Sequence, residues 1–135
     1  MLPKLSSSFF EKSEKYNPIL ISITLVLFCI GLYFSLIGSP PDMVQGDSMR
    51  IMYIHVPSAW LSLMIYTLLA FSCILWFIFR NPIFSLTGRS LAQIGATFTL
   101  LALVTGSIWG KPTWGTWWAW DARLTSMLIL FFLYL

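Results

Sequence analysis

The hydrophobic positions of this chain are gathered into long uninterrupted runs, which short polar segments separate. Three runs, at residues 19–37, 59–79 and 91–109, are close to the roughly 20 apolar residues that a helix needs to cross a bilayer. Another run begins near residue 124 and reaches residue 135, which is too short to cross. Apolar runs of this length are typical of membrane helices. The pattern therefore predicts an all-α integral membrane protein, a polytopic helix bundle with three complete spans and the start of a fourth.

The last run and the first run each need an interpretation. An unfinished span leaves backbone groups without partners in hydrocarbon, which costs several kcal/mol per group. We therefore expect an N-terminal portion of a longer protein, or a chain that needs a partner.

For the first run, a cleaved signal peptide is the competing interpretation, with an apolar core of about 7–15 residues before a small-residue cleavage site. This run is longer and leads into GSPPD at residues 38–42, so we expect a retained span.

The composition agrees with a membrane protein and argues against a nucleic-acid partner. Of the 135 residues, 58% are hydrophobic and 10% are charged, whereas a soluble domain carries about 25% charged residues. The net charge of +3 is small and is spread over several loops. A nucleic-acid-binding domain would instead gather its basic residues on one face.

The basic residues near the ends of the runs predict an orientation. Five of them belong to the N-terminal tail and to the loop after the second run: Lys4, Lys12, Lys15, Arg80 and Arg89. Three belong to the opposite side: Arg50, Lys111 and Arg123. Because Lys and Arg are enriched on the cytoplasmic side, we expect a cytoplasmic N-terminus. We also expect a single membrane domain over residues 1–135, whose loops 38–58 and 110–123 share the outer face.

The first outer loop contains the only histidine of the chain, His55. Asp47 or Ser48 is a plausible N-cap before it. Apolar and aromatic side chains then recur at helical spacing: Met49, Met52, Tyr53, Val56 and Trp60. We therefore expect His55 in the first turns of a helix at the outer membrane boundary. Its role stays open at this point between an interfacial side chain with one hydrogen bond and a metal ligand.

The residues that could join His55 in a zinc site are missing. A structural zinc site needs four Cys, His or carboxylate ligands. Cys29 and Cys73 belong to separate spans and form no CxxC pair. We expect both to be small buried hydrophobic side chains without a redox or metal-binding role.

The second outer loop has an unusual density of tryptophan. The stretch WGKPTWGTWWAWDARLTS, residues 109–126, places five tryptophans within twelve residues. Interfacial anchoring explains one or two of them, such as Trp109. The others are better explained by a flat apolar platform with N–H donors at its rim. Such a platform needs either a helix, on which Trp114, Trp117 and Trp118 share a face, or an extended chain, in which Trp118 and Trp120 do.

A large planar apolar ligand with anionic edges would suit this platform. Lys111, Arg123 and Arg50 would meet the anionic groups. Haem fits on three counts, because it is flat, carries two propionates and accepts histidine as an axial ligand. A quinone needs no axial ligand, and an anionic lipid makes no use of stacked indoles. Asp121 is better suited to pair with a basic neighbour or to cap the helix that begins at Ala122.

Two motifs resemble those of a known family. Trp114-Gly115, Trp118, Trp120 and Asp121 match the WGxxWxWD signature of the haem-handling proteins of cytochrome c maturation. The continuation ARLT, residues 122–125, is similar to the CcmC (haem exporter protein C) branch. The CcmF and CcsA branches usually continue with an acidic, proline-containing segment, which is absent here. The stretch HVPSAW, residues 55–60, also resembles CcmC in the region before its second span.

The resemblance implies a haem chaperone of the inner membrane that is not an enzyme. The family has six spans, holds a b-type haem transiently on the outer face and passes it to the haem chaperone CcmE. It acts beside the ABC-type subunits CcmA and CcmB and the small subunit CcmD. A bacterial inner membrane is the expected location, with a mitochondrial inner membrane as the alternative. Competing hypotheses are a cytochrome c haem lyase of the CcmF/CcsA type and a structural subunit without haem.

The same resemblance implies a set of haem-binding residues. His55 would be an axial ligand of the haem iron. The remaining candidates lie in the second outer loop: Lys111, Trp114, Trp117, Trp118, Trp120, Asp121 and Arg123. The family's second axial histidine belongs to a later outer loop, which these 135 residues do not contain.

Overall fold

The computed structural model describes residues 7–135, with side chains from residue 14 onward, and contains no strand in that part of the chain. It divides into two compact units, which meet between Pro40 and Pro41. The all-α fold class predicted from the hydrophobic pattern is confirmed. Lys4 and the side chain of Lys12, on which part of the orientation argument rests, lie outside the described residues.

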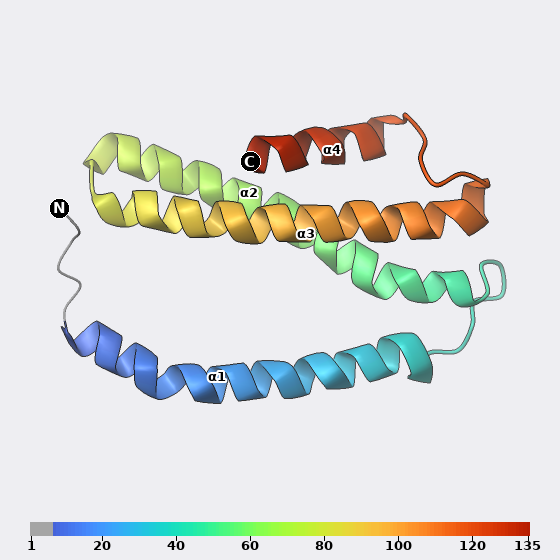
Figure 1. Cartoon of the computed structure of the whole chain (residues 1–135), viewed down its shortest axis with the longest axis horizontal. Coiled ribbons are helices and arrows are strands. Elements are labelled where there is room, and N and C mark those ends of the chain that lie inside the picture. Colours follow the sequence, from blue (N-terminus) through green and yellow to red (C-terminus); the bar gives the residue numbers. More distant parts are fainter. Residues whose placement is uncertain (1–6) are drawn as a thin grey trace. The chain divides into compact units, whose positions relative to one another are not determined.

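The first unit is one long helix. Helix α1 covers Ser7–Tyr33 and continues into a π-helical turn, η1, at Phe34–Gly38 (Figure 1). Pro18 lies inside the helix, and the hydroxyl of Ser22 donates to the Pro18 carbonyl at 2.8 Å. None of the apolar window of this helix is buried within the chain.

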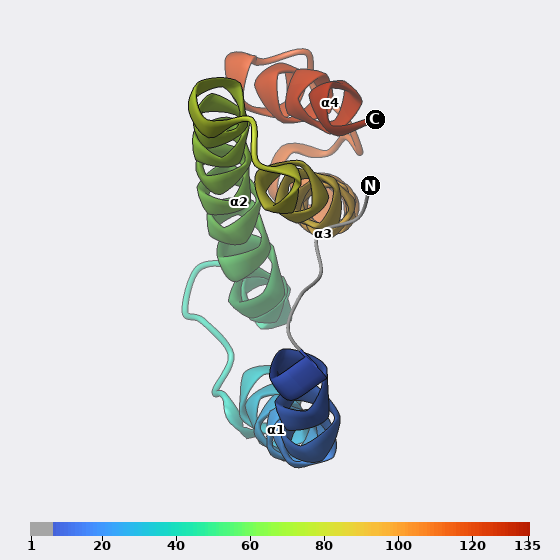
Figure 2. The same cartoon turned by 90° about the vertical axis from the view of Figure 1, so that its left-hand side faces the viewer.

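The second unit is built on an antiparallel hairpin of two long helices (Figures 1 and 2). A short 3₁₀ helix, η2 at Asp47–Ile51, leads directly into α2 at Met52–Phe79. Arg80 then turns the chain with a left-handed φ of 51°. The side chain of Asn81 accepts a hydrogen bond from the Ile83 amide at 3.0 Å, and so caps α3, which covers Pro82–Trp114.

Small side chains line the face between α2 and α3. Apart from Ile65 on α2, the buried residues of the two helices are small: Ser58, Ser62 and Ser72 on α2, and Gly88, Gly95, Thr99, Ala102, Thr105, Gly106 and Gly110 on α3. Small residues let two membrane helices approach closely, which gains van der Waals contact where lipid supplies no hydrophobic driving force. The hydroxyl of Ser72 also donates across the interface to the Phe84 carbonyl at 2.7 Å.

Helix α4, Ala122–Tyr134, runs back along α3 (Figure 1). Asp121 caps it by accepting from the Leu124 amide at 2.9 Å. Near its end, Tyr134 is 6% exposed, and its hydroxyl donates to the Ser62 carbonyl of α2 at 2.6 Å. Together with Ile65 and Leu130, Tyr134 forms the buried apolar core of the second unit. This core fixes α4 against both helices of the hairpin.

The helices are longer than the apolar runs. Segments Glu14–Gly38, Asp47–Phe79 and Pro82–Trp114 are long and apolar enough to cross a membrane, and each contains one predicted run. The two outer loops are therefore shorter than the expected ranges 38–58 and 110–123. The first is shortened by η2 and the start of α2, and the second by the end of α3. The single membrane domain over residues 1–135 stays a prediction.

Two smaller predictions are wrong. Neither Asp47 nor Ser48 caps a helix, because η2 starts after Gly46 without a side-chain cap, and the Asp47 carboxylate instead lies 3.5 Å from the Arg50 guanidinium. Cys29 and Cys73 are exposed free thiols. Apolar helix faces of a membrane protein turn outward to lipid, so a cysteine within a span need not be buried.

Candidate functional site

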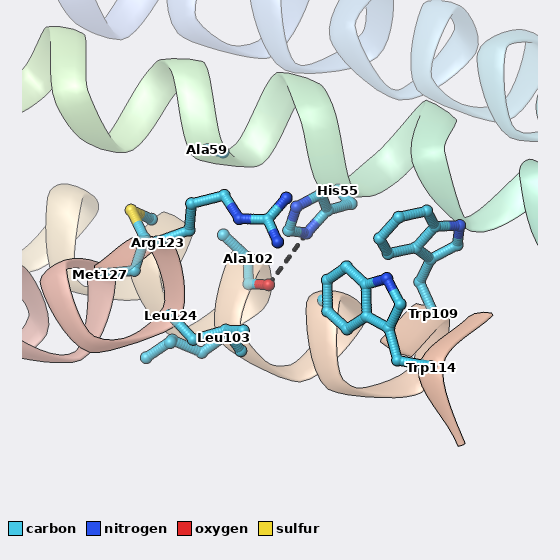
Figure 3. Close-up of a pocket in the computed structure, with 10 residues that line it drawn as sticks. His55, Ala59, Ala102, Leu103, Trp109, Trp114, Arg123, Leu124 and Met127 are labelled. Atoms are coloured by element: carbon cyan, nitrogen blue, oxygen red, sulfur yellow. Dashed lines mark hydrogen bonds between the residues drawn. The ribbon is translucent and has the colours of Figure 1, made fainter. Parts of the chain in front are cut away.

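The His55 cavity lies at the end of the hairpin where α2 begins and α3 ends (Figure 3). It has a volume of about 220 Å³ and draws its walls from α2, α3 and α4. The lining residues are His55, Ala59, Ala102, Leu103, Gly106, Trp109, Trp114, Arg123, Leu124 and Met127. Segments far apart in the chain therefore meet around the only histidine.

The imidazole of His55 is held by its Nδ1 atom. Nδ1 lies 3.0 Å from the Ala102 carbonyl oxygen and 3.2 Å from the Thr105 hydroxyl oxygen (Figure 3). A carbonyl oxygen can only accept, so Nδ1 carries the proton in this arrangement. The Thr105 hydroxyl donates to the Leu101 carbonyl at 2.7 Å, which leaves its lone pair toward the imidazole. Nε2 then carries the lone pair, and no hydrogen bond occupies it among residues 14–135.

Gly106 creates the space for this ring. A Cβ atom at position 106 would lie 2.9 Å from His55 Cε1, which is closer than real Cβ contacts. Gly106 is buried in the face that α3 turns to α2. A side chain at this position would therefore displace the imidazole from the Ala102 carbonyl.

Two tryptophans form one wall of the His55 cavity. The rings of Trp109 and Trp114 meet edge to face, with centroids 5.0 Å apart. The Trp109 indole N–H donates to the side-chain oxygen of Gln45 at 2.9 Å, which ties the first loop to the end of α3. Gly110 lies beneath the Trp114 ring, since a Cβ there would be 3.3 Å from it. The wall is thus apolar and fixed at its rim by a hydrogen bond.

Arg123 brings a positive charge to the same place. Its guanidinium lies over the Trp114 ring at 5.1 Å and donates to the Asp121 carboxylate at 2.8 and 3.2 Å. The side chain is 74% exposed. The Leu124 amide, and next the Arg123 guanidinium, hold the pKa of Asp121 below its ordinary value of 3.8. Asp121 therefore stays ionised, begins α4 and orients Arg123.

The remaining tryptophans lie on a separate loop. Helix α3 ends at Trp114 because Gly115 adopts a left-handed φ of 77°, and the Lys111 ammonium donates to the Gly115 carbonyl at 3.1 Å. The prediction that Trp114, Trp117 and Trp118 share a helix face is therefore wrong. The alternative holds for the neighbourhood of the Trp118 and Trp120 rings, whose centroids are 5.4 Å apart. The flat platform expected from it is not formed, because the two rings meet edge to face at 77°.

These loop tryptophans are exposed in different degrees. Trp117 is 57% and Trp120 77% exposed. The indole N–H of Trp118 is buried and has no hydrogen-bond acceptor among the described residues. An orphan buried donor is unusual in a folded protein.

The structure thus divides the predicted site residues. His55, Trp114 and Arg123 line one cavity, while Lys111, Trp117, Trp118, Trp120 and Asp121 lie outside its lining. Sequence reasoning missed the contribution of Trp109, which it explained as an interfacial anchor, and that of Ala102, Thr105 and Gly106 on α3. The residues GxxxG at 106–110 were the available signal, since a glycine on a helix face often marks a close approach. The haem-binding role of all these residues stays a prediction.

Comparison with known proteins identifies the family. A family model described as "Heme exporter protein C" matches residues 3–135. The chain belongs to the heme exporter protein C family. The resemblance drawn from the WGxxWxWD and HVPSAW stretches is therefore confirmed.

Proteins similar to this chain occur in bacteria and in plants. A "Putative cytochrome c biosynthesis ccmC-like mitochondrial protein" of Marchantia polymorpha is 50% identical over 99% of this chain and 59% of its own length. "Heme exporter protein C" of Bradyrhizobium diazoefficiens is 46% identical over 94% of this chain and 48% of its own length. The protein of that name from Escherichia coli K12 is 46% identical over 88% of this chain and 49% of its own length. The chain spans about half the length of the curated relatives it matches.

Proposed function

We propose that this protein binds haem at the His55 cavity and presents it for transfer during the biogenesis of c-type cytochromes. Membership of the heme exporter protein C family and the residues around His55 support this proposal. The protein is a carrier and not an enzyme in this account, because the covalent attachment of haem belongs to its partners. The haem is a b-type haem, held transiently as cargo.

The arrangement of His55 carries the proposal. Nδ1 donates to the Ala102 carbonyl, which fixes the tautomer and the ring orientation and leaves the Nε2 lone pair for iron. Metal-binding histidines commonly donate their second ring N–H to a backbone carbonyl in this way, which also raises the basicity of the ligand nitrogen. An interfacial histidine would make the same hydrogen bond through Nδ1, so the ligand role is supported by the unoccupied Nε2 and by the cavity that His55 lines.

The other walls of the cavity suit the macrocycle and the propionates of haem. Trp109 and Trp114 offer apolar surface to a macrocycle, and Arg123 offers a cation to a propionate. The cavity of about 220 Å³ is smaller than the roughly 300–1,000 Å³ of typical ligand pockets. Residues 41–135 would therefore enclose one edge of the haem and leave the rest open, which suits a carrier that must release its cargo.

We propose that the exposed tryptophan loop meets the acceptor. Trp117 and the Trp118–Trp120 pair belong to the loop between Trp114 and Arg123, which line the cavity, but they do not line it themselves. Exposed aromatic side chains such as Trp117 and Trp120 are enriched in protein interfaces. The haem chaperone CcmE is the proposed acceptor, with CcmA, CcmB and CcmD as further partners.

The site faces the outer side of a bacterial inner membrane, with a cytoplasmic N-terminus. A mitochondrial inner membrane is the alternative, since two relatives are named as mitochondrial.

Haem absorption in variants of His55 tests the proposal. The protein, produced from its natural coding sequence and purified in detergent, should show a haem Soret band that His55→Ala strongly weakens. Free imidazole should restore the band in His55→Ala, because it can fill the space beside Gly106 and Ala102. An unchanged band in His55→Ala would remove His55 from the site. The absence of haem from every preparation would favour the structural subunit.

The two groups of tryptophans can be separated in a second experiment. Trp114→Ala should lower haem retention, whereas Trp118→Ala combined with Trp120→Ala should lower the amount of haem-loaded CcmE while retention stays near normal. Normal loading of CcmE by both variants would contradict the proposal. Accumulation of loaded CcmE in the absence of the protein would instead favour a haem lyase.

A further inference from the structure

A second hollow, the Arg89 groove, lies at the opposite end of the α2–α3 hairpin. Its volume is about 300 Å³. Leu69, Cys73 and Trp76 line it from α2, and Phe84, Gly88 and Arg89 line it from α3. Ser85 and Ala92 complete the lining, and the walls are largely apolar apart from Arg89 and Ser85. The groove shares no residue with the His55 cavity.

The packing of the two helices makes the floor of the groove rigid. Gly88 is buried, and a Cβ there would meet Leu69 at the ordinary contact distance of 3.6 Å. The hydroxyl of Ser72 holds the Phe84 carbonyl at 2.7 Å. The helices therefore stay close at Gly88 while the larger side chains of Trp76 and Phe84 form walls on either side.

Two arginines give this end of the hairpin a positive charge that no acidic residue of the hairpin itself neutralises. Arg89 lies in the wall of the groove, and Arg80 lies in the turn between the helices. No acidic residue occurs in the sequence between Asp47 and Asp121. Among the described side chains neither arginine forms an ion pair. The Arg80 guanidinium stacks on Trp76 at 5.2 Å, which orients the charge without neutralising it.

We propose that the Arg89 groove binds one anionic phospholipid. Both helices are long and apolar enough to cross a membrane, so the turn at Arg80 lies where lipid headgroups are found. An acyl chain would lie along Leu69, Cys73 and Phe84, and the phosphate would meet Arg89, with Arg80 close by. A free phosphate would make no use of the apolar walls. A packed partner helix would have to bring its own acidic residue, since an arginine buried without a counter-charge is costly.

Retention of lipid by the purified protein tests this proposal, and it does so independently of haem. The protein is exchanged into detergent that contains equal amounts of phosphatidylglycerol and phosphatidylcholine, and bound lipid is counted by native mass spectrometry. We expect phosphatidylglycerol to be retained preferentially. Arg89→Gln should lower that retention about fivefold, as expected for one basic residue near an anionic headgroup. Lys15→Gln, which removes a charge outside the groove, should leave it unchanged.

A second pair of variants fills the space without changing charge. Cys73→Trp places a large side chain in the groove, whereas Cys29→Trp places the same side chain at an exposed position of α1. Only Cys73→Trp should reduce the retained phosphatidylglycerol. Equal retention of both lipids by the unmodified protein, or full retention in both Arg89→Gln and Cys73→Trp, would overturn the proposal. Displacement of the lipid by inorganic phosphate would assign the arginines to a free anion and overturn it as well.

Discussion

An aromatic ring from another helix packs against a glycine of α3 at two places. The two contacts differ in whether the ring keeps a polar atom without a hydrogen bond. Gly95 faces the ring of Tyr134, and Gly106 faces the imidazole of His55. The two glycines are eleven residues apart, which is close to three helical turns, so they lie on one face of α3. In both contacts the ring donates a hydrogen bond to a backbone carbonyl of a neighbouring helix, Ser62 for Tyr134 and Ala102 for His55.

The two rings differ in their surroundings and in the number of polar atoms that can still bind a ligand. Tyr134 is buried among Ile65 and Leu130, and its single hydroxyl is used. His55 is half-buried beside a cavity and has a second ring nitrogen. The same packing of a ring against a glycine therefore completes the apolar core at Gly95. At Gly106 it leaves the Nε2 lone pair of His55 without a partner among the described residues. Variants at the two positions should separate stability from ligand binding.

The largest effect is expected for Gly95→Leu. A side chain at position 95 would overlap the Tyr134 ring, and overpacking of this kind costs about 1–3 kcal/mol or more. Thermal unfolding in detergent should shift clearly to lower temperature, and α4 should become sensitive to protease. Gly31→Leu is the matched control, because nothing lies within 4 Å of a Cβ at Gly31. Equal stability of the two variants would contradict the close fit at Gly95.

Gly106→Ala should act on the ligand more than on the fold. Its Cβ would lie 2.9 Å from His55 Cε1, so the imidazole must move away from the Ala102 carbonyl. We expect a weaker haem Soret band with a smaller loss of thermal stability than in Gly95→Leu. Gly31→Ala serves as the control. A normal Soret band in Gly106→Ala would show that the orientation of His55 does not matter for haem.

Tyr134→Phe should act on the fold and not on the ligand. The change leaves the buried Ser62 carbonyl without its side-chain donor, at a cost of about 1 kcal/mol. The control is Tyr66→Phe, since the two rings form an edge-to-face pair and the Tyr66 hydroxyl has no hydrogen bond within the described part of the chain. Thermal stability should fall only in Tyr134→Phe, with the Soret band intact in both. Loss of haem in Tyr134→Phe would mean that the two ends of α4 are coupled.

Thr105→Val should have a small effect on His55. The change removes one of the two oxygen atoms near Nδ1, at 3.2 Å, while the Ala102 carbonyl at 3.0 Å remains. We expect haem affinity to change by no more than about fivefold, the equivalent of about 1 kcal/mol for one hydrogen bond. A titration of the apoprotein with haem measures this change. A loss as large as that of His55→Ala would assign the orientation of the ring to Thr105.

The smallest effect concerns the start of α4 and its dependence on pH. The pKa of Asp121 is lower in the folded protein than its ordinary value of 3.8, chiefly through the Leu124 amide. Its contribution to stability is therefore fully present above about pH 4 and is lost as pH falls through the folded-state pKa. Thermal unfolding followed between pH 6 and pH 3 should show a slightly steeper loss of stability than in Asp121→Asn. Parallel pH profiles would contradict a role for the ionised carboxylate.

Local chemistry made several elements predictable. The apolar runs lie inside the long helices because a span must satisfy its backbone hydrogen bonds internally, and only a helix does so within one segment. Asp121 caps α4 and pairs with Arg123 as expected, since these residues are neighbours in sequence. The pairing of Trp118 with Trp120 follows from the alternation of an extended chain. Each of these features depends on residues within a few positions of one another.

The sequence by itself determined the membrane class, the helices and the family, and it singled out His55 and the tryptophan segment as candidates. Only the tertiary structure decided which of these residues meet. The Ala102 carbonyl and Trp109 come to His55 because small residues let α2 and α3 lie close together, and Arg123 reaches the cavity because Tyr134 and its neighbours hold α4 against them. The hydrogen bonds that His55 and Tyr134 make across these helices join positions 47 and 72 residues apart. The periodicity and spacing of residues along the chain do not predict these long-range contacts, because the contacts depend on how whole helix faces pack against one another.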